Sequence, residues 1–110
     1  MIKEDVRFEK ATIGGSALFA EALIERDAWF DGVIINGDAR FEKVTIRGLA
    51  RFEGATIEGV AMFGGAIIEG DAWFNGVTIK GASFEAATIK GYITFALANI
   101  AFLTFKNAKL

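Results

Sequence analysis

Large apolar residues recur at every fifth or sixth position from residue 8 onward, and Phe alternates with Ile along most of this series. Two residues before each one stands a smaller apolar residue, alanine in fourteen of twenty cases, and two residues after it stands glycine in eleven. Because residues two apart share a face of an extended chain, this pattern predicts strands of about three residues, each with an inward small and large side chain, separated by sharp corners. The large residues are Phe8, Ile13, Phe19, Ile24, Phe30, Ile35, Phe41, Ile46, Phe52, Ile57, Phe63, Ile68, Phe74, Ile79, Phe84, Ile89, Phe95, Ile100, Phe105 and Leu110.

An eleven-residue period is also compatible with a right-handed helical coiled coil, but the placement of the apolar residues excludes it. At about 100° per residue, a helix would spread each Phe, the next Ile and their small partners over several faces. A glycine at every fifth or sixth position would also cost a helix about 1 kcal/mol each. In a corner, by contrast, glycine permits positive φ. The sequence therefore predicts an all-β fold with no α-helical domain.

Short extended segments with the same inward pair can close into a coil that hydrogen-bonds to coils on either side, about 4.8 Å away. Units such as 39–43 and 44–48 consist of a small residue, a variable one, a bulky one and two turn residues. In these units the chain resembles the pentapeptide-repeat family, from residue 6 to residue 110. The resemblance implies a right-handed quadrilateral β-solenoid with four units per coil and, at this length, five coils. We expect residues 1–5 to be a lead-in and residues 6–110 to form the solenoid domain.

The repeat departs from the family pattern in two ways. The residue before the bulky one, often Asp or Asn in the family, is here Arg, Thr, Trp, Leu, Ile or Met. Several corners also hold one extra residue, and where this residue is aspartate we expect it to hydrogen-bond its own turn rather than to act in catalysis. The segment 27–30 returns as 71–74, two coils later, which suggests internal duplication or deliberate design. The extra residues are Ser16, Asp27, Asp38, Leu49, Val60, Asp71 and Tyr92.

The composition argues against an enzyme or a metalloprotein. The chain contains neither histidine nor cysteine, so the commonest general base and the commonest zinc ligands are missing. The glycine pairs at 14–15 and 64–65 lack the lysine and the following helix of a phosphate-binding loop. We therefore expect no catalytic residue, no cofactor, no metal ion and no small-molecule substrate.

Charge and hydropathy narrow the range of partners. Twelve basic and fourteen acidic residues are interspersed and leave a net charge of −2, which does not indicate a nucleic-acid-binding surface. No apolar stretch reaches the eighteen residues of a membrane span, and the first residues do not resemble a signal peptide. We expect a cytoplasmic protein that binds neither nucleic acid nor membrane.

Apolar residues replace polar ones at the corners of the last coil, at 96–97 and 101–102. An exposed apolar patch of this kind typically marks an interface, and the family resemblance implies a homodimer formed through C-terminal coils. The alternative is that these side chains fold over the open end of the core as a local cap. The candidate residues for this homodimer or end-to-end self-association are Leu97, Phe102, Leu103 and Leu110.

One face of the predicted solenoid carries a column of alternating Arg and Trp, one residue from each successive coil. Guanidinium groups and indole rings at this spacing can stack, which would stabilise the face. The alternative is a protein-binding surface, because exposed Trp and Arg are favoured interface anchors. The residues of this column are Arg7, Trp29, Arg51 and Trp73.

An acidic column, Glu9, Asp31 and Glu53, runs beside it and raises a second hypothesis for function. Some members of the family resemble duplex DNA in charge and girth and inhibit a type II topoisomerase, DNA gyrase. Here the column ends at Asn75 and Ala96, and basic residues lie beside it. The sequence therefore favours a non-catalytic structural scaffold or protein-interaction module, with the DNA mimic as the alternative.

Overall fold

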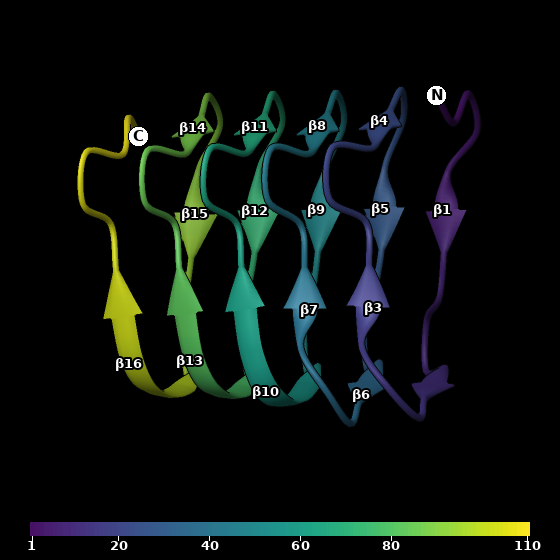
Figure 1. The fold of residues 1–110 in the computed structure, drawn as a ribbon, viewed down its shortest axis with the longest axis vertical. Coiled ribbons are helices and arrows are strands. Elements are labelled where there is room, and N and C mark those ends of the chain that lie inside the picture. Colours follow the sequence, from purple (N-terminus) through teal and green to yellow (C-terminus); the bar gives the residue numbers. More distant parts are fainter.

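The protein, described over residues 1–110 by a computed structural model, is a parallel β-solenoid without helices. Four short strands complete one turn of the chain, and the fifth strand pairs with the first. Successive coils lie side by side along one axis, with the two termini at opposite ends (Figure 1). Most strands are two residues long, one fewer than predicted. A tight turn bond, such as the one from the N–H of Ala11 to the carbonyl of Phe8, leaves each phenylalanine of the repeat and the small residue three positions later outside the strands. The all-β solenoid predicted from the sequence is confirmed.

The solenoid has four faces, which we number in chain order. The first carries the outward residues of the Arg and Trp column and consists of five parallel strands. The fourth consists of four strands, extended by isolated bridges from Ile2 to Ile24 and from Thr88 to Lys109, so the chain makes between four and five turns. The strands of the first face are β1 (Val6–Arg7), β5 (Ala28–Trp29), β9 (Ala50–Arg51), β12 (Ala72–Trp73) and β15 (Ile93–Thr94). Those of the fourth are β4 (Leu23–Ile24), β8 (Thr45–Ile46), β11 (Ile67–Ile68) and β14 (Thr88–Ile89).

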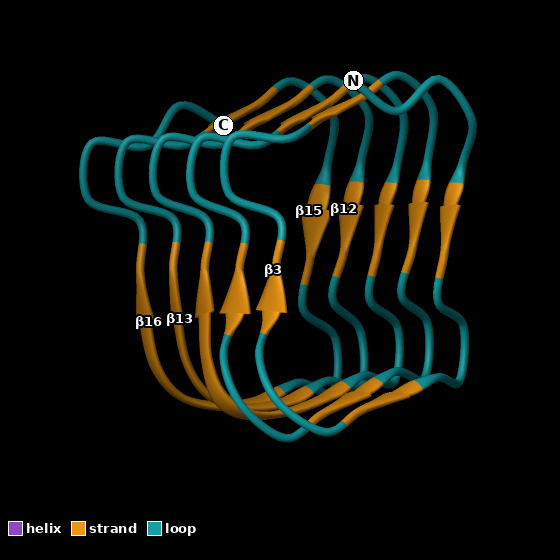
Figure 2. Cartoon of the chain, turned by 45° about the vertical axis from the view of Figure 1, so that its right-hand side comes forward, coloured by secondary structure: helices purple, strands orange, loops and turns teal.

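The second and third faces merge into one sheet, because three strands continue around the corner between them (Figure 2). These are β10 (Thr56–Met62), β13 (Thr78–Ser83) and β16 (Asn99–Thr104). The earlier coils contribute separate strands, β2 (Thr12–Ile13) and β6 (Ile34–Ile35) on the second face and β3 (Ala17–Leu18) and β7 (Ala39–Arg40) on the third. The corner is one residue shorter in β13 than in β10, so the register shifts between Ile57 and Val60. In β13 and β16 the chain therefore passes this corner with one residue fewer than in β10.

Two columns of stacked phenylalanine rings fill the solenoid together with the Ile residues of the other two faces. Within a column, Phe52 lies with its ring centroid 5.0 Å from those of Phe30 and Phe74, and the rings are within 6° of parallel. Between columns, Phe52 meets Phe41 and Phe63 edge to face, at 5.6 and 5.7 Å. Both arrangements are favourable for aromatic rings. All six phenylalanines of the middle coils are fully buried, as the alternating pattern predicted.

The corners after each phenylalanine require a left-handed backbone residue. Gly32, Gly54, Gly65 and Gly76 adopt φ of 66 to 69° there, as expected for glycine. The other phenylalanine corners place ordinary residues in the same conformation, among them Lys43 at φ 58°. Turn geometry is therefore set by the fold, and glycine relieves its conformational cost at only some of these corners.

Five of the corners after an isoleucine use glycine for a different reason, which is close contact between coils. A Cβ atom at Gly48 would overlap the carboxylate of Asp27, and one at Gly37 would lie 2.6 Å from the Ser16 hydroxyl oxygen. The Asp27 carboxylate reaches this position because it accepts a hydrogen bond from the backbone N–H of Leu49, at 2.7 Å. The absence of a side chain at Gly48 thus makes room for a bond between neighbouring coils.

The extra aspartates at these corners therefore do not hydrogen-bond their own turns, and that expectation was wrong. Asp38 accepts from the N–H of Val60 at 2.9 Å, and Asp71 accepts from that of Tyr92 at 2.8 Å, each one coil further along the chain. The carboxylate points along the solenoid axis, where the next coil presents a backbone donor within reach. These side chains connect adjacent coils, and their role is structural.

Candidate interaction surfaces

The predicted column of Arg and Trp is present on the first face. The guanidinium carbon of Arg51 lies 4.3 Å from the ring centroid of Trp29 and 4.8 Å from that of Trp73, so the arginine is stacked between the two indoles. Arg7 covers the other side of Trp29 at 4.9 Å. At partly exposed sites such contacts contribute about 0.5–1 kcal/mol each. Both faces of the Trp29 ring and one face of the Trp73 ring are thus covered by arginines of the same chain.

The acidic column beside it is neutralised by the same arginines. Arg51 lies 3.0 Å from a carboxylate oxygen of Asp31 and 3.7 Å from one of Glu53, and Arg7 lies 2.6 Å from one of Glu9. The hydrogen bond from Arg7 lowers the pKa of the Glu9 carboxyl below its ordinary value, so this group stays ionised and paired near neutral pH. A continuous line of unpaired negative charge, as on a DNA backbone, is absent from this face.

The apolar residues of the last coil are exposed at its corners. Leu97 is 95% exposed and Phe102 is 73% exposed, so neither side chain folds over the end of the core as a cap. Leu103 and Leu110 are also exposed. The rings of Phe95 and Phe105 in this coil remain partly accessible. The last coil therefore presents apolar surface both at its corners and across its open end.

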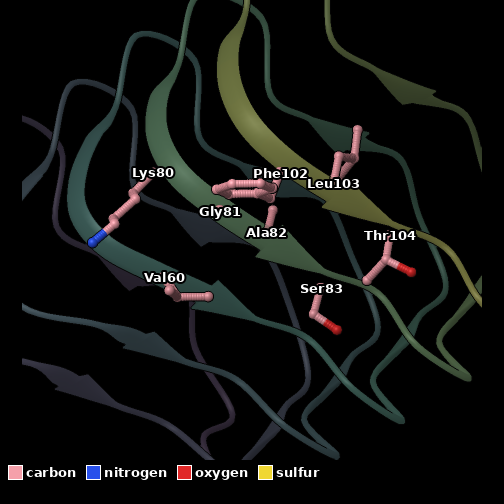
Figure 3. A pocket seen from close by; sticks show the side chains of 8 residues that line it. All are labelled: Val60, Lys80, Gly81, Ala82, Ser83, Phe102, Leu103 and Thr104. Carbon is pink, nitrogen blue, oxygen red and sulfur yellow. The ribbon is translucent and has the colours of Figure 1, made fainter.

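A shallow apolar groove of about 440 Å³ crosses the corner between the second and third faces (Figure 3). Gly81 forms its floor where a side chain is missing, because an added Cβ would lie 3.7 Å from the Cβ of Phe102 and 4.0 Å from a methyl group of Val60. Lys80 is the only charged residue on its border. The lining residues are Val60, Lys80, Gly81, Ala82, Ser83, Phe102, Leu103 and Thr104.

Sequence reasoning did not find this groove, although the sequence carried a signal for it. The spacing from Ile79 to Phe84 is five residues, whereas the spacing from Ile57 to Phe63 one coil earlier is six. The missing residue narrows the corner in later coils and leaves a hollow beside the wider one. The two sets of candidate residues predicted from the sequence lie apart from each other. The Arg and Trp column is on the first face, and the exposed apolar residues are on the last coil.

Comparison with known proteins places this fold in a family. The sequence matches the family described as pentapeptide repeats (9 copies) over residues 2–45 and again over residues 36–78. Together the two matches cover more than half of the 110 residues. The chain belongs to the pentapeptide-repeat family. Searches of curated proteins and of solved structures gave no match to this pentapeptide-repeat chain.

Pentapeptide-repeat proteins are generally non-catalytic. In this member, no three Asp or Glu side chains converge where they could hold a metal ion. The structure also has no helix with the length and hydropathy of a membrane span. Its surface consists of the flat faces, the corners and the two end coils.

Proposed function

We propose that this pentapeptide-repeat chain is a non-catalytic scaffold that binds a second copy of itself through its last coil, residues 93–110. The exposure of Leu97, at 95%, and of Leu110, at 66%, is the observation that carries the proposal. Corners of the earlier coils hold mainly charged residues, polar residues and glycine, whereas the corner at Leu97 exposes a large apolar side chain. Burying both leucines against an equivalent surface would remove them from water in each copy.

The backbone of the last coil supports the same proposal. In the preceding coil, the N–H groups of Ala72 and Phe74 donate to the carbonyls of Tyr92 and Thr94 at 2.8 and 2.9 Å. The corresponding N–H group of Phe95 points beyond the last coil, where this chain supplies no acceptor. Exposed edges of β-sheets are prone to pair with another strand. A second copy placed end to end would satisfy this edge and cover the phenylalanine rings behind it.

The mass in solution tests the proposal. Light scattering across a concentration series should give a mass of at least twice the 11.9 kDa of one chain. The double substitution Leu97→Glu/Leu110→Glu puts charge into the end-to-end interface and should lower that mass, because an unpaired buried charge is costly. The matched control is Ile67→Glu, which adds charge at an exposed apolar residue of a middle coil on the fourth face.

Circular dichroism should confirm that every variant keeps its β-sheet content. A wild-type chain that stays at 11.9 kDa at all concentrations would refute self-association. An unchanged mass for Leu97→Glu/Leu110→Glu would refute the last coil as its site, and so would an equal effect of Ile67→Glu.

A further inference from the structure

We propose a second self-interaction surface, in which two copies pack third face against third face in antiparallel orientation. The first coil of each copy then lies on the last coil of the other, and the middle coils meet at a two-fold axis. This contact uses the flat side of the solenoid and does not depend on the end-to-end contact. It rests on three observations, namely the distribution of charge along the axis, the composition of the middle coil and the complementarity of the paired corners.

Charge is distributed unevenly along the solenoid axis. Residues 1–71 contain thirteen acidic and eight basic residues, whereas residues 72–110 contain one acidic and four basic residues. The first coil, residues 1–27, contains six acidic and four basic residues, and the last coil, residues 93–110, contains two basic and no acidic residues. An antiparallel pair places the net negative first coil against the net positive last coil of the other copy, whereas a parallel pair would place like charges together.

The middle coil disfavours the first and fourth faces for this contact. In an antiparallel pair this coil meets its own equivalent, so any charge on it would face a like charge. Arg51 on the first face and Glu69 beside the fourth would each be repelled in this way. On the third face the middle coil presents Met62 and, at the adjoining corner, Gly64–Gly65. These residues carry no charge and allow close approach.

The corner between the third and fourth faces pairs opposite charges in this arrangement. Glu21 in the first coil comes opposite Lys106 in the last, and Lys43 in the second coil comes opposite Glu85 in the fourth. None of these four residues forms an ion pair within the chain. Because of the two-fold symmetry each pairing occurs twice, so the dimer contains four such ion pairs. Such an interface is self-complementary and closes at two copies.

The exposed apolar groups of the third face are complementary as well. Leu18 on β3 is 71% exposed, and it comes opposite Thr104 at one end of the groove in the other copy. Phe102, which borders the same groove, comes opposite Gly14–Gly15, where an added Cβ would meet nothing within 4 Å. The groove and the glycine pair thus provide space for the two most exposed apolar side chains of this face.

Charge reversal tests the pairing in the Leu97→Glu/Leu110→Glu background, which removes the end-to-end contact. This background should still form a dimer of twice 11.9 kDa. Glu21→Lys should then raise its dissociation constant about tenfold or more, because two like-charge contacts form per dimer. Adding Lys106→Glu should restore the affinity to within about threefold, since both contacts regain opposite charges. The control Glu25→Lys makes the same charge change in the first coil, away from the third face.

Cross-linking supplies an independent measurement, because the chain has no cysteine of its own. With a short bifunctional thiol reagent, Met62→Cys should cross-link two copies at the axis, whereas Ile67→Cys on the fourth face should not. The proposal is overturned if the background is a monomer, if Glu25→Lys weakens the dimer as much as Glu21→Lys, or if Lys106→Glu fails to restore it. Failure of the end-to-end contact has a different signature, since Leu97→Glu/Leu110→Glu would then leave the wild-type mass unchanged.

Discussion

Replacement of Phe52 by alanine measures how much the stacked core contributes to stability. The side chain is 0% exposed and contacts four other phenylalanine rings, two stacked and two edge to face. Truncation of a buried Phe costs about 3–5 kcal/mol, and each aromatic pair adds about 0.5–1.5 kcal/mol beyond burial. We therefore expect a loss near the top of that range, about 5 kcal/mol. Phe8 is only partly buried and has two ring neighbours, so Phe8→Ala should cost about half as much.

Equilibrium unfolding in urea, followed by circular dichroism, gives both free energies. Protein concentration is held fixed, because self-association would add to apparent stability. Phe52→Leu is the matched control, since it keeps most of the apolar volume and should lose much less. A loss below about 1 kcal/mol for Phe52→Ala, or an equal loss for Phe8→Ala, would show that the rings are not packed as described.

Three further substitutions test the corners and the first face by the same unfolding measurement. Gly48→Ala should destabilise several times more than Gly54→Ala, because only a Cβ at residue 48 would meet backbone and carboxylate atoms of the previous coil. Gly54→Ala bears only the cost of about 1 kcal/mol for positive φ, so equal losses would contradict the described packing. Leu49→Asn should stabilise by about 1 kcal/mol, since its side-chain oxygen would restore an acceptor for the next coil at a position where the aspartate series is interrupted. If stability does not increase, the next coil has no free backbone N–H donor at this position. Thr94→Arg should stabilise by about 0.5–1 kcal/mol by stacking on the uncovered side of Trp73, and Thr94→Gln should not.

The sequence predicted the parts of the fold that follow from a repeated choice of inward residues. Phe and Ile at alternating positions indicated which side chains form the core, and their spacing indicated which residues stack between coils. The pairing of Trp29 with Arg51 is one consequence, because both precede a phenylalanine and lie 22 residues apart. Such features depend on the local sequence pattern alone, so they could be predicted from the sequence.

Other features depend on the distance and direction between coils, which the sequence does not display. The bond from Leu49 to the Asp27 carboxylate exists because the next coil presents a donor along the axis, whereas a turn considered alone favoured a local bond. Lys43 adopts positive φ because the corner requires it, although its residue type disfavours that conformation. The groove at Gly81 arises because two neighbouring coils differ by one residue at this corner, and a search for a repeated pattern overlooks such a difference. For the Asp27 bond and the groove, the deciding neighbour lies about 22 residues away.

The ladder of hydrogen bonds between coils also constrains how the molecule can assemble from an unfolded chain. An isolated coil retains only tight turn bonds, such as the one from the N–H of Ala11 to the carbonyl of Phe8, and gains nearly all others when a neighbour forms. Folding must therefore begin with at least two adjacent coils, and further coils can then form on either side of them. A chain emerging from the ribosome would need roughly 44 residues outside the exit tunnel before any of it could hold its shape.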